Sequence, residues 1–339
     1  MGKPTTKDLA KAAGVSLATV DRVLNARAGV RQATVDRVQK AIREINYVRD
    51  LAAADLARRK EYNLVFVLPE HDDEYVRQIE DAITEANVSL IYERTQVSIL
   101  HAPANDPHQV ALILDSLLCD RTDGVAIMAP ETPQVRDAIS RLEARGIDVV
   151  ALVSSQPTAK SADYVGINNK AAGRTAAQLV GRFTAGRSGR VLVLTETMQG
   201  RDSQERRLGF DQVIAAFAPR LQVLPSMETY GDPARTARII KRALQNQPSI
   251  VGIYLMNHEI RDAMQAIRTQ TAVIVGHELT PHARACLLDG TMDALISQDV
   301  GHLVRSSIRL LRAKATRRET VASQERIRIE IILRENMPD

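Results

Sequence analysis

Residues 5 to 25, TTKDLAKAAGVSLATVDRVLN, constrain the fold more than any other stretch, because they predict two short helices joined by a tight turn. Thr5 or Thr6 is the expected N-cap of the first helix, with a hydroxyl that accepts a free backbone N–H. Gly14 is placed to end this helix, since glycine adopts a positive φ without steric cost. The inward-facing residues expected from helical spacing are Leu9, Ala12 and Ala13.

A second helix is predicted from Ser16, whose hydroxyl is expected to accept a backbone N–H near Thr19. Val20, Val23 and Leu24 then share one side of this helix. The opposite side carries residue types that read base edges, since arginine pairs with guanine, asparagine with adenine, and leucine or alanine contacts a thymine methyl. The residues on this outward face are Leu17, Ala18, Asp21, Arg22 and Asn25.

A third amphipathic helix is predicted over residues 31 to 45. Its expected inward residues are Val35, Val38, Ile42 and Ile45. Three short helices that close on one small core make a helix-turn-helix domain of the DNA-binding kind. Residues 1 to 60 hold 13 Lys or Arg against 6 Asp or Glu, a net of +7 in a chain of net +4, so the remainder carries −3. The basic charge expected of a polyanion binder therefore belongs to this N-terminal part.

Three motifs follow one another here: AGVSxxTVxRVLN at 13–25, TxxRVxxAIxxINY at 34–47 and AxxLARxK at 53–60. In order and spacing they resemble the lactose-repressor (LacI/GalR) family of bacterial transcription factors. The resemblance implies a helix-turn-helix DNA-binding domain over residues 1–47, a hinge over 48–62, and a homodimer on a pseudo-palindromic operator. The DNA-binding residues that it implies are Thr5, Ser16, Leu17, Ala18, Thr19, Asp21, Arg22, Asn25, Thr34, Ala53 and Leu56.

Residues 48 to 62, VRDLAAADLARRKEY, have too little apolar surface to hold a helix alone, because helix nucleation is costly and packing must supply the rest. The resemblance implies that they form a hinge helix when two subunits bind the operator, with Leu56 wedged into the minor groove. The alternative for Leu56 is a linker leucine that packs on its own core. Two features depart from the family: Asp21 stands where serine is usual, and residues 48–50 replace the usual Pro-Asn.

From residue 63 the pattern changes to short buried-strand runs that alternate with amphipathic stretches. This alternation predicts parallel sheets covered on both faces, and the strands are too many for one ordinary sheet. We therefore expect an α/β effector-binding and dimerisation domain over residues 63–339, built as two doubly wound lobes with a cleft at the carboxyl ends of the strands. The expected strands lie at 63–69, 96–102, 124–130, 148–154, 189–195, 222–228, 250–255, 272–278 and 293–297, and the expected helices include 74–94, 107–118 and 171–183.

The body carries the further motifs GINNKAAGRTAA at 166–177, SxxRRLGF at 203–210 and GHELTP at 276–281. With their order of elements, they resemble the sugar-binding periplasmic proteins of the ribose type. Val153 and Ser154 replace the Asp-Arg pair that several of these proteins carry, so a sugar, deoxy sugar, polyol, sugar acid or less polar metabolite stays open as the ligand. Amides, carboxylates and an arginine that converge around an aromatic ring suit a polyhydroxylated ligand. The ligand-binding residues implied are Asp72, Tyr75, Arg206, Asn257, Glu278 and Gln298.

We predict no catalytic residue, cofactor or metal site. In HELTPH, at 277–282, the histidines stand five apart rather than four, and Pro281 interrupts any helix that would align them. The acidic run 71–74 suits a helix N-terminus better than a metal site. Cys119 and Cys286 are expected to be buried free thiols in a reducing cytoplasm. The N-terminus lacks the apolar core of a signal peptide, and no apolar run approaches the ~20 residues of a membrane span.

The sequence therefore predicts a cytoplasmic, homodimeric, ligand-responsive regulator, associated with the nucleoid when bound to DNA, and favours a repressor. The tail, RIRIEIILRENMPD, alternates as a strand and lacks the leucine heptads that some family members use to form tetramers, which favours a dimer. Two alternatives remain. One is a sugar-binding or enzymatic protein with an appended helix-turn-helix head, and the other is a ligand-independent architectural DNA binder, which leaves the cleft-forming body unexplained.

Overall fold

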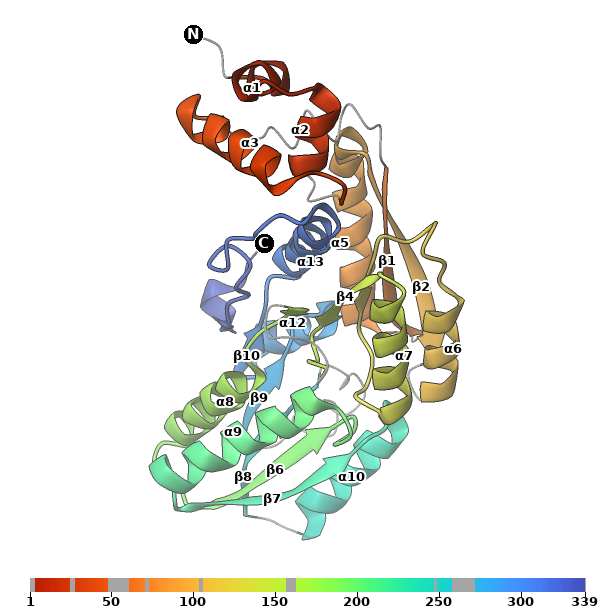
Figure 1. The fold of residues 1–339 in the computed structure, drawn as a ribbon. Coiled ribbons are helices and arrows are strands. Elements are labelled where there is room, and N and C mark those ends of the chain that lie inside the picture. Colours follow the sequence, from red (N-terminus) through yellow and green to blue (C-terminus); the bar gives the residue numbers. More distant parts are fainter. Residues whose placement is uncertain are drawn as a thin grey trace. The chain divides into compact units, whose positions relative to one another are not determined.

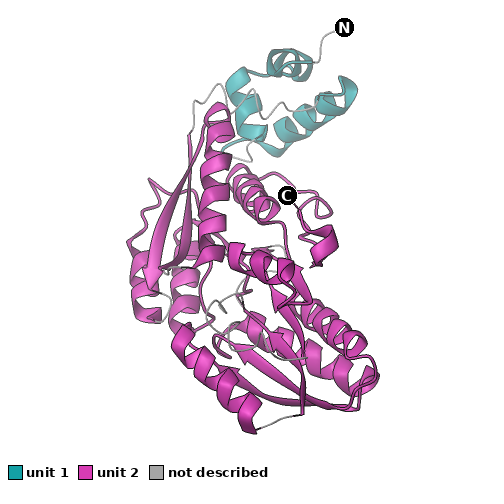
Figure 2. Cartoon of the chain, turned by 180° about the vertical axis from the view of Figure 1, so that it is seen from behind, with its two compact units in different colours: residues 1–60 teal, residues 61–339 magenta. Residues whose placement is uncertain are grey.

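The computed structural model divides the chain into two compact units, Met1–Lys60 and Glu61–Asp339, which we call the head and the body (Figure 2). The structure describes residues 4–24, 28–47, 61–70, 73–103, 106–156, 163–246, 249–257 and 272–338. The predicted site residues Asn25, Ala53, Leu56 and Asp72, and positions 48–60 of the predicted hinge, lie outside the described residues. Strand β1 begins at Tyr62, inside the range predicted for the hinge.

The described helices of the head are α1 (Thr6–Ala13), α2 (Leu17–Leu24) and α3 (Gln32–Glu44). Thr5 caps α1 in a reciprocal capping box with Asp8, so two orphan donors of the helix start are satisfied. Gly14 ends α1 in the left-handed conformation, at φ 62°. Ser16 Oγ accepts the backbone N–H of Thr19 at 3.2 Å, which fixes the start of α2.

The head has its own small core around Leu9, Val20 and Val38, which are fully buried. The prediction that Ala12 faces this core is wrong, because Ala12 is exposed and Ala10 is buried instead. Helical spacing fixes which residues of α1 form a row but not which flank of that row meets the other two helices. That choice depends on packing between the helices.

The first lobe of the body is a five-stranded parallel sheet in the order β2-β1-β3-β4-β5. Its strands are β1 (Tyr62–Glu70), β2 (Thr95–Pro103), β3 (Gly124–Ile127), β4 (Asp148–Leu152) and β5 (Tyr164–Val165). Its connecting helices are α5 (Glu74–Leu90), the 3-10 turn η1 (Ile91–Glu93), α6 (Pro107–Ser116) and α7 (Pro133–Ala144). Side chains of Asp73, Asp106 and Thr132 cap α5, α6 and α7, so each helix starts where its capping residue stands.

The second lobe is a six-stranded sheet in the order β11-β10-β9-β8-β6-β7, parallel except between β10 and β11. Its strands are β6 (Gly189–Thr195), β7 (Leu221–Glu228), β8 (Ile250–Leu255), β9 (Val273–His277), β10 (Ala294–Ser297) and β11 (Glu330–Ile332). The remaining helices are α8 (Asn169–Phe183), α9 (Arg201–Phe217), α10 (Pro233–Asn246), α12 (Pro281–Leu288), α13 (Val300–Thr316) and the 3-10 turn η3 (Arg334–Asn336). The chain enters this lobe after β5, returns after β10 to pack α13 against β3, β4 and α5, and crosses again to β11 (Figure 1).

Both sheets are covered on two faces, as their sequence pattern predicts. Along β1, Leu64 and Phe66 pack into the layer that contains α5 and α13, while Val65 and Val67 pack into the layer that contains α6 and α7. Alternate residues of a strand face opposite layers, so a strand buried on both sides is a continuous apolar run. In the second lobe, α8 and α9 cover one face of the sheet and α10 and α12 the other (Figure 1).

The predicted fold class, a small helical head with a two-lobed parallel-sheet body, is confirmed. Each predicted strand run overlaps an observed strand, and among the described strands the short β5 at Tyr164–Val165 was not predicted. Two adjacent residues are too few to show a hydrophobic period. Both cysteines are free, but the prediction that Cys119 is buried is wrong. Cys119 lies in the turn between α6 and β3, where Leu117, the C-cap of α6, is buried but Leu118 is exposed like the cysteine.

Helices α8 and α9 approach each other very closely, because a glycine of each helix faces the backbone of the other. A Cβ atom on Gly173 would lie 1.9 Å from the carbonyl oxygen of Arg206, and one on Gly209 would lie 2.1 Å from that of Lys170. Real Cβ atoms do not approach a carbonyl oxygen so closely, so only glycine fits at either position. This helix contact therefore explains Gly173 and Gly209 in two of the body motifs.

The first prediction concerns this contact. Gly173→Ala should lower the free energy of unfolding of the body by about 2 to 3 kcal/mol, because the new methyl must push two helices apart. The matched control is Gly301→Ala in α13, where the methyl meets the mobile guanidinium of Arg305 at 2.7 Å and alanine favours the helix by about 1 kcal/mol. Urea denaturation of both variants measures the difference. Equal stability of the two variants would contradict the close-packing argument.

Candidate functional site

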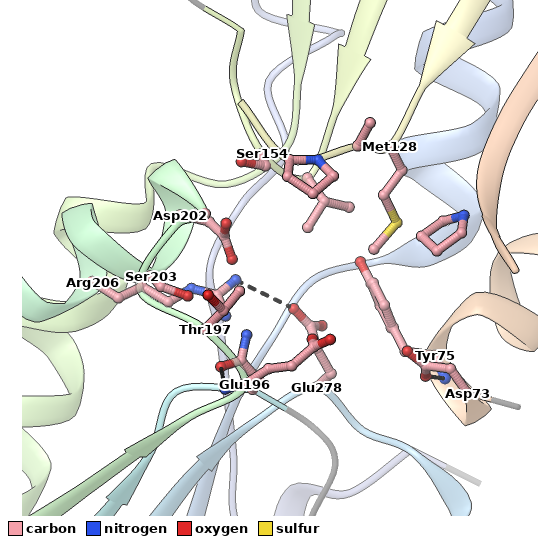
Figure 3. A pocket seen from close by; sticks show the side chains of 16 residues that line it. Asp73, Tyr75, Met128, Ser154, Glu196, Thr197, Asp202, Ser203, Arg206 and Glu278 are labelled. Atoms are coloured by element: carbon pink, nitrogen blue, oxygen red, sulfur yellow. Dashed lines mark hydrogen bonds and ion pairs between the residues drawn. The ribbon is translucent and has the colours of Figure 1, made fainter. Parts of the chain in front are cut away.

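A cleft opens in the body between its two lobes, at the carboxyl ends of strands from both sheets (Figure 3). Ligands of open parallel sheets bind at this edge. The cleft has a volume of about 940 Å³, including the part that is open to solvent. Residues that follow β1, β3 and β4 line it from the first lobe, and residues that follow β6, β8 and β9, with the first turns of α9, line it from the second.

The two walls of the cleft differ in chemistry. The first-lobe wall is largely apolar, and its apolar members are Pro69, Met128, Ala129, Pro130 and Val153. The second-lobe wall is polar and charged, and its polar members are Glu196, Thr197, Asp202, Ser203, Arg206, Asn257 and Glu278. A ligand that fills the cleft therefore meets hydrogen-bonding groups mainly on one side.

Arg206 is a deeply buried charge of this wall, with 2% of its surface exposed. Its Nε donates to Asn169 Oδ1 at 2.8 Å and its Nη1 donates to the carbonyl oxygen of Met256 at 2.5 Å. Its Nη2 lies 3.9 Å from Glu278 Oε1, and it makes no hydrogen bond to the described residues. Burial opposes the charged guanidinium, but the carboxylates of Asp202 and Glu278 outweigh it and raise the pKa of Arg206 above its usual value. Arg206 therefore presents one cationic donor to the cleft.

Glu278, Gln298 and Tyr75 form a buried network that joins the two lobes. Gln298 Nε2 donates to the Tyr75 hydroxyl oxygen at 2.8 Å and to Glu278 Oε1 at 3.0 Å. Burial raises the pKa of the Tyr75 hydroxyl well above its usual value, with a further contribution from the Glu278 carboxylate. Tyr75 thus stays a neutral phenol that faces the cleft.

Asn257 stands directly after β8, and its carboxamide oxygen is already occupied. Thr195 Oγ1 donates to Asn257 Oδ1 at 2.7 Å, and the backbone N–H of Glu196 donates to the same oxygen at 2.8 Å. The amide nitrogen is therefore the polar atom of Asn257 that is left for a ligand.

The structure brings most of the sequence-predicted ligand residues together. Tyr75, Arg206, Asn257 and Glu278 line the cleft, while Gln298 lies behind the wall and holds Tyr75 and Glu278. Asp72 lies outside the described residues. Their role in binding stays a prediction.

Sequence reasoning missed several residues of the cleft. Glu196 and Thr197 follow the end of β6, so the same strand-end rule that selected Asn257 would have selected them. Asp202 and Ser203 gave no comparable signal, because their place depends on where α9 begins. Asp73, also in the cleft, is the N-cap of α5, so the helix N-terminus predicted for the run 71–74 is present.

Two further hydrogen bonds join the lobes beside the cleft. Glu74 Oε2 accepts the backbone N–H of His282 at 3.1 Å, at the start of α12. Gln78 Nε2 donates to the carbonyl oxygen of Leu279 at 2.9 Å. Glu74 and Gln78 are one turn apart on α5, so one face of this helix touches the second lobe.

Strained backbone occurs at the strand ends that shape the cleft. Val153 has φ 61° and Glu278 has φ 62°, and neither residue is glycine. The N–H of Ser154 donates to the carbonyl oxygen of Leu152 at 2.5 Å, which closes a tight turn around Val153. A β-branched residue is rare in this conformation, and such strain tends to occur at ligand sites.

The second candidate site is the outward face of α2 in the head. Leu17 is 47% exposed, and Ala18 and Arg22 are exposed beside it. Thr19 and Asp21 are partly exposed on the same helix. The other described members of the predicted DNA-binding set, Thr5, Ser16 and Thr34, lie at the starts of α1, α2 and α3. Helix starts present free backbone N–H groups, which suit phosphate.

Neither histidine of the HELTPH stretch joins a metal-binding group. His277 is buried, and its Nε2 lies 2.9 Å from the hydroxyl of Tyr254. The ring of Tyr254 is stacked on that of Phe210. His282 Nε2 lies 3.6 Å from Cys286 Sγ on α12. Among the described residues, no cluster of three His, Cys, Asp or Glu side chains is arranged to hold a metal ion. None of the described helices is both long and apolar enough for a membrane span.

Comparison with known families accounts for both parts of the chain. Residues 64–319 match the model of the periplasmic binding protein domain, and residues 5–50 match the model of the bacterial regulatory proteins of the lacI family. The chain belongs to the periplasmic-binding-protein domain family, and its head is of the lacI family. The predicted resemblance is confirmed.

Individual relatives are more distant. Catabolite control protein A of Staphylococcus aureus (strain MRSA252) is 27% identical over 165 residues, 48% of this chain and 47% of the relative. The HTH-type transcriptional repressor PurR of Actinobacillus pleuropneumoniae (strain L20) is 29% identical over 148 residues, 44% of this chain and 42% of the relative. The matched regions thus span about half the length of these curated relatives. A solved structure of GanP, a glucose-galactose binding protein from Geobacillus stearothermophilus, has a TM-score of 0.73 at 18% identity and covers 82% of this chain and 99% of its own, which shows the shared fold.

The second prediction tests the buried charge of the periplasmic-binding-protein-type body. Arg206→Met should lower the free energy of unfolding by about 3 to 5 kcal/mol, because Glu278 loses its nearest cation in a buried site. The matched control is Arg207→Met. Arg207 pairs with the half-exposed Asp211 at 2.8 Å, so this substitution should lower the free energy of unfolding by no more than about 1 kcal/mol. Chemical denaturation measures both. A small, equal effect of the two substitutions would show that Arg206 is not a structural centre of the cleft.

Proposed function

We propose that this chain is a transcriptional repressor that binds a pseudo-palindromic operator as a homodimer and responds to a small carbohydrate-like metabolite in the cleft of its body. The observation that carries the proposal is one chain with two sites of different chemistry. The head exposes Leu17, Ala18 and Arg22 on one helix face, and the body encloses Arg206 and Glu278 in a cleft. The chain acts in the cytoplasm, associated with the nucleoid when it is bound to DNA.

The surface of the head supports DNA reading. Val20 of α2 is fully buried in the head core, so the opposite side of the helix, with Arg22, stays open to a partner. Arginine reads guanine in the major groove through two hydrogen bonds, and leucine or alanine contacts the thymine methyl. The basic excess of residues 1 to 60 supplies the phosphate attraction that any sequence requires.

The walls of the cleft support a small hydroxylated ligand. Arg206, Asn257 and Glu278 line the cleft from three segments of the second lobe. Tyr75 presents an aromatic ring from the first lobe (Figure 3). Such a set satisfies several hydroxyl groups at once, and an unsatisfied buried hydroxyl costs ~1 to 3 kcal/mol. A ligand in contact with both walls also favours one relation of the lobes, which is the basis for control.

The alternative function is a sugar-binding or enzymatic protein with an appended head. Operator binding separates the two functions, because the alternative does not require the head to discriminate between DNA sequences. A ligand that changes operator affinity supports the regulator alone.

The third prediction concerns base reading. Arg22→Ala should weaken binding to the operator by ~1 to 3 kcal/mol and relax the base preference at one position of each half-site, because a bidentate base contact is lost. The control, Arg43→Ala, removes the same charge from the exposed end of α3 and should affect operator and scrambled DNA alike. Fluorescence titrations with both DNAs test this. Equal losses on both DNAs for Arg22→Ala would identify Arg22 as a phosphate contact.

The fourth prediction concerns coupling through the predicted hinge, residues 48–62. Leu56→Ala should weaken operator binding and reduce the factor by which ligand changes it, because the hinge helix loses its minor-groove wedge. The ligand affinity of the free protein should stay nearly unchanged. By linkage, the operator must change ligand affinity by the same factor as ligand changes operator affinity.

Calorimetric titrations with and without operator measure this factor. The ligand is the sugar, polyol or sugar acid that most stabilises the protein in a thermal-shift screen. Leu288→Ala, which truncates a half-exposed leucine at the end of α12, serves as the control. Full coupling in the Leu56 variant would reduce the hinge to a passive tether.

A further inference from the structure

Most charged side chains that line the cleft are acidic. Asp73, Glu196, Asp202 and Glu278 line it, and Arg206 is the cation among the lining residues that the structure describes. We propose that the effector carries a protonated amine, as an amino sugar or amino polyol does, and that its ammonium group binds Asp202. This inference rests on the proposed role of the cleft as the effector site.

Three of the four carboxylates are already engaged within the protein. Asp73 Oδ1 accepts the backbone N–H of Tyr75 at 2.7 Å, at the start of α5. Glu278 Oε1 accepts from Gln298 and lies 3.9 Å from Arg206 Nη2. Glu196 also has an interaction partner. These carboxylates therefore serve the framework of the cleft before any ligand arrives.

Asp202 differs from the other three. Within the described residues its carboxylate makes no hydrogen bond and no ion pair, and it acts on Arg206 only through space. It stands in the first turn of α9, and its side chain extends from that helix towards the open part of the cleft (Figure 3). Asp202 is thus the acceptor that is free to bind a ligand.

The charge balance of the second-lobe wall decides which ligand suits Asp202. The second-lobe wall holds three carboxylates, those of Glu196, Asp202 and Glu278, against the one guanidinium of Arg206, so it carries more negative charge than the guanidinium offsets. A sugar acid would bring a further negative charge to this wall, which electrostatics disfavours. A neutral sugar offers only hydroxyl donors, whereas an ammonium group offers donors and the missing positive charge.

The opposite wall limits the rest of the ligand. Met128, Pro130 and Val153 offer no side-chain hydrogen bond there. Ser154 is 8% exposed, and its Oγ has no hydrogen-bond partner among the described residues. A buried hydroxyl without a partner is unfavourable, so it suits one polar atom of a ligand. The effector therefore has an amine and hydroxyl face towards the second lobe and a less polar face towards the first.

The test uses the full chain without DNA and matched ligand series at a pH at which the amines are protonated. One series is D-glucose, D-glucosamine and D-glucuronate, and the other is sorbitol and 1-amino-1-deoxysorbitol. Calorimetric titration should give each amine an affinity about tenfold or more above that of its hydroxyl counterpart, because a hydrogen bond to a charged group is stronger than a neutral one. The glucuronate should bind most weakly.

Two substitutions on α9 assign the preference to its cause. Asp202→Asn keeps the size of the side chain and should bring the amine and its hydroxyl counterpart to similar affinities. Asp211→Asn is the control, because Asp211 pairs with Arg207 at 2.8 Å and does not line the cleft. The Asp211 variant should keep the full preference for the amine.

Three results would overturn the inference: a neutral or acidic ligand that binds as tightly as its amine, an Asp202→Asn variant that keeps the preference, or no amine that binds at millimolar concentration. Binding of neutral sugars without amines would reject the amine and leave the cleft as the effector site. Operator binding by a chain that takes up no small molecule of either series or of the thermal-shift screen would reject the effector site itself.

Discussion

The buried guanidinium of Arg206 is the interaction on which the cleft depends. A charge at this depth is tolerated only where its donors are satisfied and a counter-charge is near. Asn169 Oδ1 of α8 and the carbonyl oxygen of Met256 after β8 accept two of its hydrogen bonds, and the carboxylates of Asp202 and Glu278 balance its charge. Arg206 reaches Asn169 because Gly173 and Gly209 let α8 and α9 touch. Gly173 and Gly209 are therefore as necessary to the site as Arg206, which lines it.

The same residues explain why the cleft has two unlike walls. The second lobe brings charged groups to the ends of β6, β8 and β9, whereas the ends of β3 and β4 in the first lobe carry Met128, Pro130 and Val153. The resemblance to sugar-binding proteins predicts a charged pair at Val153 and Ser154. The wall carries a tight turn there instead. Met128, Pro130 and Val153 carry no charge, so in the proposed amine complex the positive charge that faces Asp202 comes from the ligand.

The sequence predicted the fold more completely than it predicted the residues that line the cleft. The buried strands were predictable because both faces of each sheet are covered, so each strand is a nearly continuous apolar run such as 63–69. Arg206 and Asn257 were predictable because motifs and strand ends mark them. Asp202 was not, since no local pattern states where α9 starts, and Gln298 was assigned to the wall because sequence does not distinguish a residue that faces a cavity from one that supports it.

Control by a ligand depends on how firmly the lobes already hold each other. Glu74 and Gln78 of α5 bond to the loop before α12, and Gln298 bonds to Tyr75, so the described contacts between the lobes include several hydrogen bonds of about 0.5 to 1.5 kcal/mol each. Breaking these bonds in an opening of the lobes would cost a few kcal/mol, the range in which a two-state equilibrium keeps its minor state measurably populated. A ligand shifts such an equilibrium only by the difference between its affinities for the two states. The proposed effector binds Asp202 on one wall and packs against Met128 on the other, and it gains both contacts only when the lobes are together. Its contact with both walls, rather than its total affinity, therefore sets the size of the response.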